Sequence, residues 1–359
     1  MNELQKLNVR TIAKLKQLNQ DLKEVIFKSL NGRTVEGAVV YAFEKTDFEN
    51  AQQGIIVGGV VESMAIPYAS TQTTIASVEA GNWYLNHEFR GGIKLSDSLH
   101  TADMQKQITK QLDDFLKVDS SVYDYKKALK GVDSFDKLPK PINELFDELK
   151  QTGVLDPKTI RRAETYVATL DGRDVTELRK GYQTAIDMAT KGFDSQTAID
   201  KAIKSKTEYI QQRIVRTEST NAYDIAFNRK IADDDLVMGW YWILSPMHPA
   251  PDDCDFKAEY DGFGAEGYYP KGFDVDRHPN CLCEREEATR GTVEQTPYSE
   301  ESVKKQMDGY SELKRAQIVG VGNAKEKNYI EPLKKLGFDG ESKRKPEMLP
   351  KKFIEGENK

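Results

Sequence analysis

The 359-residue chain contains only three cysteines, four histidines and three tryptophans. It also lacks a long apolar segment, because the longest apolar run, residues 54–61, ends at Glu62. A bilayer-spanning helix needs roughly 20 apolar residues, so we expect no membrane-spanning role and no membrane partner. No secretory signal opens the chain, and we therefore expect a reducing compartment in which disulfides are disfavoured.

Common enzyme motifs are missing as well. The sequence has no Gly-x-x-x-x-Gly-Lys phosphate loop, no His-Glu-x-x-His zinc-protease pair and no Gly-x-Ser-x-Gly nucleophile elbow. The net charge is −6, so the whole molecule has no general attraction to nucleic acid or to anionic membranes. We expect a protein that is not an enzyme, and any contact with DNA must be local.

The spacing of apolar residues predicts a mainly helical chain up to about residue 232. One-sided helices are indicated from Leu4 to Leu30, from Ser96 onward, from the Asp156-Pro157 cap, and from residue 194 or 195 to Ile225. Further helical segments are expected through residues 175–185 and from Ser299 to Arg315. The helix-forming pattern stops at three consecutive aspartates, residues 233–235.

The length of the chain suggests two or three folding units, and the sequence patterns divide it into four parts. They are a helical N-terminal region (1–150), a helical bundle (151–232), a small loop-rich α+β module (233–290), and one helix followed by a basic flexible tail (291–359). The fold class is therefore mainly α, with a small C-terminal α+β module.

Every cysteine of the chain lies between positions 254 and 283. Cys254, His278, Cys281 and Cys283 are donors suited to a closed tetrahedral site, and we predict that they bind a structural Zn²⁺ ion that staples the module. His248 is a reserve ligand. Only one residue separates Cys281 from Cys283, which is a short spacer for two ligands. The alternatives are small buried hydrophobic cysteines, or a disulfide from Cys254 that leaves one thiol over.

Three other residues are expected to have structural roles. Trp240 and Trp242 lie in a strand-like run, and because side chains alternate along a strand they share one face, where core packing is favoured over base stacking. Glu218 lies on the packed face of its helix, so it needs a partner such as an arginine or backbone amides. A structural ion pair is favoured over a catalytic glutamate.

Basic residues recur near the C-terminus. A flexible, solvated tail is the simple interpretation. The alternative is that these residues bind DNA phosphates or an acidic protein surface. The candidate phosphate contacts are Lys343, Arg344, Lys345, Lys351 and Lys352.

Several spaced motifs resemble the phage Mu F-like minor head protein family. The resemblance covers roughly residues 197–285, and Leu95-Ser96-Asp97 resembles a looser upstream feature. The motifs are Arg216-Thr217-Glu218, Asn221-Ala222, Trp240-Tyr241-Trp242, Ser245-Pro246-Met247-His248-Pro249, Asp252-Asp253-Cys254-Asp255, Gly267-Tyr268-Tyr269-Pro270 and His278-Pro279-Asn280-Cys281-Leu282-Cys283.

The resemblance implies a structural minor capsid protein of a tailed bacteriophage. Such a protein acts in head morphogenesis, DNA packaging or ejection, lies at the portal vertex or inner shell of the virion, and is made in the host cytoplasm. The implied partners are the portal protein, the major capsid or scaffolding protein, and packaged DNA through the basic tail. The alternative is a zinc- or thiol-dependent hydrolase that acts during virion maturation.

Overall fold

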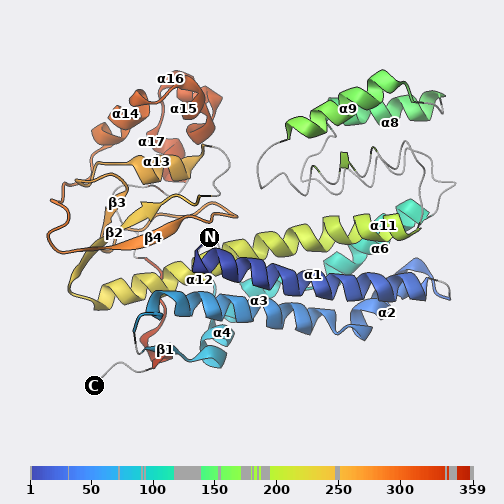
Figure 1. Ribbon diagram of the computed structural model, residues 1–359, viewed down its shortest axis with the longest axis horizontal. Helices are drawn as coiled ribbons and strands as arrows, with labels where there is room; N and C mark the ends of the chain where they lie inside the picture. The colour runs from blue at the N-terminus through green and yellow to red at the C-terminus, as the bar shows by residue number, and fades with distance from the viewer. Residues whose placement is uncertain are drawn as a thin grey trace. The chain divides into compact units, whose positions relative to one another are not determined.

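The computed structural model describes residues 2–30, 32–71, 73–89, 92, 94–116, 139–152, 155–170, 179, 182–183, 186, 195–246, 251–335, 338 and 346–355. These residues are mainly helical, with a small three-stranded antiparallel sheet and one two-stranded pairing (Figure 1). None of the helices described has the length and apolar character needed to cross a membrane.

The helices fall into two groups along the chain. The first group is α1 (Glu3–Ser29), α2 (Val35–Lys45), α3 (Phe48–Ala65), α4 (Ser77–Asn86), α5 (Leu95–Ser98), α6 (Ala102–Leu116), α8 (Lys140–Thr152), α9 (Pro157–Thr169), α11 (Ser195–Ile203) and α12 (Tyr209–Asp233). The second group is α13 (Asp253–Glu259), α14 (Glu300–Gly309), α15 (Glu312–Val319), α16 (Val321–Glu326) and α17 (Ile330–Lys335). Short helical turns cover Ile66–Tyr68, Lys204–Glu208 and Lys351–Phe353.

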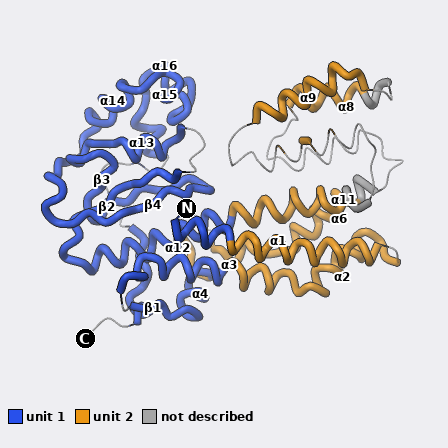
Figure 2. The backbone as a smooth tube through the Cα atoms, in the orientation of Figure 1, with its two compact units in different colours: residues 1–9, 57–85, 214–359 blue, residues 10–56, 86–213 orange. Residues whose placement is uncertain are grey.

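Two compact units each combine separate stretches of the sequence (Figure 2). Unit 1 contains Met1–Val9, Val57–Leu85 and Ile214–Lys359, and unit 2 contains Arg10–Ile56 and Asn86–Arg213. The predicted parts 233–290 and 291–359 therefore lie within one unit, and the N-terminal residues contribute to both units.

Unit 2 has an aliphatic core with a row of polar side chains inside it. Leu22, Ile108 and Ile199 belong to the apolar cluster and are fully buried. The Lys23 ammonium lies 3.2 Å from the Glu208 carboxylate, and both side chains are largely buried. Glu208 ends a π-helical turn, Lys204–Glu208, which interrupts the continuous helix that the sequence predicts from residue 195 onward.

Unit 1 is built around the small sheet, in which β2 (Val237–Ile243) lies between β3 (Tyr268–Pro270) and β4 (Glu284–Thr289). The register pairs Trp240 with Tyr269 on one side and with Glu287 on the other. Gly239 is required at its position, because a Cβ atom there would lie 2.2 Å from the Tyr269 carbonyl oxygen.

Helices from both sides of this module complete its core. Figure 1 shows the sheet between α12 and the group of helices α13–α17. The rings of Trp240 and Tyr269 stack with centroids 4.6 Å apart, and Val303 and Met307 of α14 are fully buried in the same cluster. The loop-rich module therefore shares its core with the residues that follow it.

Local signals fixed several helix ends as predicted. The Asp156 side chain accepts a hydrogen bond from the Lys158 amide at the start of α9, and Ser299 does the same for Ser302 at α14. Two expected helices are each divided into two, α5 with α6 and α14 with α15. Thr101 precedes α6, and its amide and hydroxyl donate to the Glu49 carboxylate. The Ser311 side chain caps α15 by accepting from the Lys314 amide. The helix expected through residues 175–185 lies largely outside the described residues.

Candidate metal centre

Two short segments bring the cysteines together in unit 1. Cys254 lies in the first turn of α13, whose start is fixed by a capping box between Asp252 and Asp255. Cys281 and Cys283 lie in the turn that leads into β4. All three thiols are free and buried, with 0%, 2% and 1% of the residues exposed for Cys254, Cys281 and Cys283.

Helix α12 holds the second of these segments in place. The Thr217 hydroxyl accepts a hydrogen bond from the Asn280 amide at 3.3 Å, and the Thr220 hydroxyl donates to the Cys281 carbonyl at 3.1 Å. Asn280 has a φ of 66°, a left-handed conformation that asparagine tolerates better than most residues. The turn is therefore fixed by its own backbone and by α12.

The donor atoms of Cys254, His278 and Cys281 lie within 4.8 Å of one another. The two sulfurs are 3.6 Å apart, which is too far for a disulfide bond of about 2.05 Å. Two thiolates on one tetrahedral Zn²⁺ ion, each about 2.3 Å from it, would be about 3.8 Å apart. The sulfur separation therefore fits a shared metal ion and excludes the disulfide alternative in this state.

The ring of His278 is oriented for ligation through Nε2. Its Nδ1 lies 2.8 Å from the Pro279 carbonyl oxygen, which can only accept, so Nδ1 carries the proton of that hydrogen bond. A backbone partner of this kind commonly fixes the tautomer of a metal-binding histidine. Nε2 faces Asp252 at 3.2 Å, and the side chain is 24% exposed.

The pKa values of the three thiols are shifted in different directions. Hydrogen bonds from Cys254 and Cys283 lower the pKa of Cys281 well below its usual value, even though burial raises it. The same interactions raise the pKa of Cys254 well above normal. For His278, burial alone would lower the pKa, but hydrogen bonds to Asp252 and Cys281 outweigh it and raise the pKa to about 11. Negative charge is thus concentrated at the Cys281 sulfur.

Cys283 is placed less clearly than the other ligands. It lies outside the group whose donor atoms are all within 4.8 Å of one another. Its thiol nevertheless interacts with its two neighbours. A hydrogen bond with Cys254 lowers the pKa of Cys283, but a hydrogen bond with Cys281 and burial outweigh it and raise the pKa to about 12. Of the two cysteines in this turn, Cys281 therefore belongs to the central donor group and Cys283 lies at its edge.

The two carboxylates next to the cysteines, Asp252 and Asp253, already have partners within the protein. The Asp252 side chain accepts a hydrogen bond from the Cys254 amide at 2.7 Å, and Asp253 forms a short buried ion pair with Lys257. The fully buried Lys257 ammonium also donates to the Asp276 carbonyl at 2.7 Å. Asp252, Asp253, Cys254 and His278 form a second group of possible ligands, but these contacts favour the thiol-rich set.

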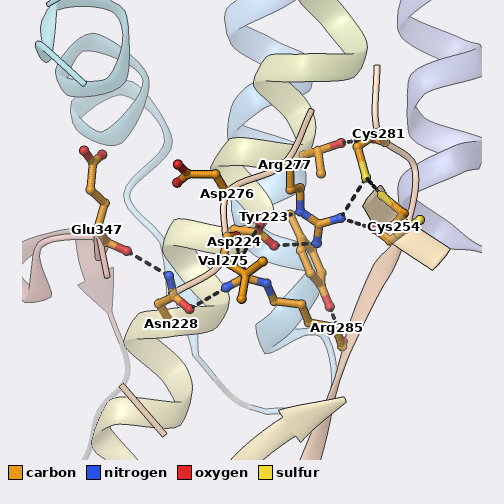
Figure 3. Close-up of polar contacts among 12 residues, drawn as sticks. Tyr223, Asp224, Asn228, Cys254, Val275, Asp276, Arg277, Cys281, Arg285 and Glu347 are labelled. Carbon is orange, nitrogen blue, oxygen red and sulfur yellow. Dashed lines mark hydrogen bonds and ion pairs between the residues drawn. The ribbon is translucent and has the colours of Figure 1, made fainter. Parts of the chain in front are cut away.

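A buried arginine connects the cysteines to α12 (Figure 3). The Arg277 guanidinium contacts the Asp224 carboxylate through Nε at 2.5 Å and Nη2 at 2.7 Å, a two-point ion pair. Its Nη1 donates to the Cys283 carbonyl and lies 3.6 Å from the Cys281 sulfur. Burial alone would lower the pKa of Arg277, but Asp224 raises it well above its usual value.

A second arginine extends this network. Arg285 Nη2 lies 3.3 Å from Asp224, and its Nη1 donates to the Asn228 side chain at 2.9 Å. Asn228 in turn donates to the Glu347 carbonyl at 3.1 Å, as Figure 3 shows. Both guanidinium groups are almost completely buried, and these contacts replace most of the water that they lose. Among the described residues, Arg285 Nε has no hydrogen-bond partner.

The two tryptophans are covered by these cations. Trp240 and Trp242 are buried on one face of β2 with ring centroids 6.1 Å apart, as the alternation of the strand predicts. Arg285 lies over the Trp240 ring at 4.2 Å, and Arg277 lies over the Trp242 ring at 4.9 Å. The aromatic faces are used inside the protein and are closed to base stacking.

Glu218 has a different partner from those that the sequence suggests. The Tyr84 hydroxyl donates to the Glu218 carboxylate at 2.8 Å and lies 3.1 Å from its carbonyl oxygen. Burial raises the pKa of Glu218, and hydrogen bonds from Tyr84 and Asn221 offset part of that shift. The prediction that this acid needs a partner is met by a phenol and an amide, whereas an arginine or backbone amides were expected.

We predict that the Tyr84→Phe variant is less stable and the Glu218→Gln variant is not. Phenylalanine leaves a largely buried carboxylate without its main donor, so the free energy of unfolding should fall by about 1–3 kcal/mol. Glutamine keeps an oxygen that can accept from Tyr84 and removes the buried charge, so it should change stability by less than about 1 kcal/mol. Urea unfolding at neutral pH measures both changes.

The pH dependence of stability separates the two variants further. The folded pKa of Glu218 is raised, so the folded chain holds that proton more tightly than the unfolded chain does. The parent should therefore gain stability as pH falls through the raised folded pKa, down to the ordinary value of the unfolded carboxyl. Glu218→Gln should lack this gain, and an identical pH profile for parent and variant would contradict the assignment.

Sequence reasoning missed Asp224, Arg277, Arg285, Lys257 and Tyr84. The first four are charged, and such residues are usually exposed unless they are paired. One signal was present, since Arg277 directly precedes His278 in the motif. The predicted reserve ligand, His248, lies outside the described residues.

The candidate phosphate contacts are only partly described. Lys343, Arg344 and Lys345 lie outside the described residues. Lys351 is exposed, and its ammonium lies 2.8 Å from the Asp233 carboxylate. Lys352 lies over the ring of its neighbour Phe353. A role of these lysines in binding DNA stays a prediction.

No family model matches the sequence, and no curated protein or solved structure matches it either. The function of the chain must therefore be inferred from its own residues and their geometry.

Proposed function

We propose that this chain is a structural minor head protein of a tailed bacteriophage. The observation that carries the proposal is that distant elements of the Mu F-like motif set meet in one buried cluster. Trp242, Cys254 and Cys281, together with Arg277 beside the last motif, lie in contact around one small centre. Motifs that are far apart in sequence but share one core are expected of a common structural module.

The centre is suited to a structural Zn²⁺ ion. Cys254, His278 and Cys281 would hold it, and Cys283 would complete four ligands. Zinc supplies a cross-link between α13 and the turn before β4, and thiolate and imidazole donors are its preferred ligands in structural sites. Four protein ligands leave no open position for water, which favours a structural role over hydrolysis.

Charge balance supports the same ligand set. Three thiolates around one divalent cation carry a net charge of −1, and Arg277 lies 3.6 Å from the central sulfur to neutralise it. Asp224 and Arg285 form a further pair, as do Asp253 and Lys257. The buried centre is then electrically neutral, which keeps the cost of burying so many charges low.

The alternative is a thiol-dependent hydrolase with Cys281 as nucleophile and His278 as its base. The lowered pKa of Cys281 favours a thiolate, as such an enzyme requires. However, the Cys281 residue is 2% exposed and its sulfur is surrounded by Cys254, Arg277 and the α12 turn contact. A nucleophile must reach its substrate, so this burial favours the structural role.

Two measurements test the proposal separately. Antibody labelling of purified phage heads should place the chain at the portal vertex or inner shell, together with the portal protein, the major capsid or scaffolding protein and packaged DNA. Absence of the chain from purified virions would contradict the head assignment. Metal analysis of protein purified without chelator should give about one zinc per chain. A value far below one would remove the zinc site and leave the head assignment standing.

A further inference from the structure

The last described segment, residues 346–355, lies against α12 and against the short strand β1 (Thr74–Ile75), and we call it the C-terminal segment. The Leu349 amide donates to the main chain of α12 at 3.0 Å, and the Leu349 carbonyl accepts from Arg229 Nε at 2.8 Å. The end of the segment, β5 (Ile354–Glu355), pairs antiparallel with β1 (Figure 1). Backbone contacts within unit 1 therefore hold much of the segment.

This segment has the properties of an element that can dock and undock while the rest of unit 1 stays folded. Two of its apolar side chains are buried, since Leu349 and Phe353 are 0% and 5% exposed, and the lysines between them, Lys351 and Lys352, are exposed. Peripheral segments with few buried apolar side chains open at a lower free energy than the core. A group that contacts the segment in its docked form alone therefore shifts this equilibrium.

The Asn228 side chain on α12 joins the segment to the arginines around the metal centre (Figure 3). Its Nδ2 donates to the Glu347 carbonyl at 3.1 Å, and its Oδ1 accepts from Arg285 Nη1 at 2.9 Å. A guanidinium can only donate and a carbonyl can only accept, so this orientation of the amide is the one that satisfies both partners. Arg285 therefore keeps the donor of Asn228 pointed at the segment, and the amide can rotate if Arg285 moves away.

The position of Arg285 depends on the loop that carries Arg277. Nη2 of Arg285 donates to the Val275 carbonyl at 3.1 Å and lies 3.3 Å from the Asp224 carboxylate. Val275 precedes Arg277 by two positions, and Arg277 contacts both oxygens of the same carboxylate. Movement of this loop would therefore change both contacts of Nη2.

The metal centre holds this loop from its other end. Arg277 Nη1 donates to the Cys283 carbonyl and lies 3.6 Å from the Cys281 sulfur. An ion bound by the thiols fixes the turn, whereas loss of the ion removes the cross-link between the turn and α13. Movement of Arg277 then frees part of the Asp224 carboxylate. Arg285 can shift toward that carboxylate and away from the amide on α12.

We propose that the C-terminal segment is a latch that is coupled to the metal centre through Asn228, and that it docks more tightly when the centre holds its ion. By thermodynamic linkage, the docked segment raises the affinity for the metal by the same factor. Loss of the metal then uncovers a surface on α12 and β1 that the segment covers in the metal-bound chain. This inference rests on the metal site proposed above and does not depend on the head assignment.

Hydrogen exchange of residues 346–355 measures the docking equilibrium in the full-length chain. Removal of zinc by a chelator should speed exchange in this segment by at least about fivefold. Amides of α14 serve as the control for global unfolding and should stay protected. Unchanged exchange of the segment after metal analysis has shown that zinc is gone would overturn the latch and leave the metal site standing. A chain that binds no zinc would overturn both.

Two neighbouring variants on α12 separate coupling from simple attachment. Asn228→Asp keeps the acceptor for Arg285 and loses the donor to the Glu347 carbonyl, so exchange of the segment should no longer respond to zinc. Arg229→Met is the matched control, because it removes a contact to Leu349 that does not involve Arg285. Exchange should be faster with and without zinc in this control, and the ratio of the two rates should match the parent. An equal ratio in both variants would overturn the role of Asn228.

A second measurement applies if the metal-free chain loses its melting transition. The two variants are then compared in the metal-bound form by competition for zinc with a chelator. Linkage predicts that Asn228→Asp binds zinc at least about fivefold more weakly than Arg229→Met does. Equal zinc affinities of the two variants would overturn the coupling.

Discussion

The Cys281→Ser variant should lose stoichiometric zinc binding and unfold at a clearly lower temperature than the parent. Cys281 is the central donor, since its sulfur lies 3.6 Å from both the Cys254 sulfur and Arg277 Nη1. Serine is a poor zinc ligand, so the link between α13 and the turn before β4 would be lost. We expect the free energy of unfolding to fall by about 3–5 kcal/mol, which corresponds to roughly 10 °C in a domain of this size class.

Cys283→Ser is the matched comparison for this experiment. Its sulfur is the peripheral one, outside the group of donors within 4.8 Å of one another. If four ligands hold the metal, the two variants should lose similar stability. If Cys283 only hydrogen-bonds to the other thiols, its replacement should cost less and zinc should still bind. Calorimetric melting with and without chelator, together with zinc analysis, distinguishes these outcomes. Equal melting of the parent with and without chelator would contradict a structural metal.

The parts of the fold that could be predicted are those fixed by local chemistry. The apolar stripe of α1, the Asp156 cap of α9 and the Ser299 cap of α14 depend on residues a few positions apart, so the sequence contains the whole signal. The shared face of Trp240 and Trp242 follows from strand alternation alone. The break between α14 and α15 was not predicted, because its cap, Ser311, lies among other polar residues and does not stand out in the sequence.

The candidate metal centre was partly predictable for a different reason. Cysteine is rare in this chain, so its concentration between positions 254 and 283 is informative even without a structure. Spacing could not tell which thiol is central, because that depends on how α13 and the turn before β4 approach each other. The pairing of Asp224 with Arg277, 53 positions away, could not be predicted either, since charged residues normally indicate surface.

The last described segment, residues 346–355, shows the same limit. Its lysines and prolines are typical of a solvated tail, and composition favours that interpretation. Docking depends on two residues, Leu349 and Phe353, and on main-chain hydrogen bonds that no side-chain pattern records. Extended segments held through their backbone are therefore difficult to recognise from sequence.

Arg277 should be as important to the metal centre as a ligand, although it does not itself bind the ion. It pairs with Asp224 on α12, donates to the Cys283 carbonyl and approaches the Cys281 sulfur. Removal of one partner from a buried ion pair leaves an unpaired charge, which costs about 3–5 kcal/mol. Removal of an outer-shell partner of a metal ligand commonly weakens metal binding about 10–100-fold.

Arg277→Met should therefore lower both the free energy of unfolding and the affinity for zinc, whereas Asp224→Asn should lower mainly the former. Cobalt substitution gives an independent readout, because loss of the N–H contact to sulfur should shift the thiolate-to-cobalt absorption band in Arg277→Met. Lys230→Met is the matched control. Lys230 pairs with Glu287 at 2.6 Å but both side chains are partly exposed, so its loss should cost less than about 1 kcal/mol. Unchanged zinc affinity and cobalt spectrum in Arg277→Met would show that the arginine supports only the fold, and that the neutral charge balance proposed for the centre is wrong.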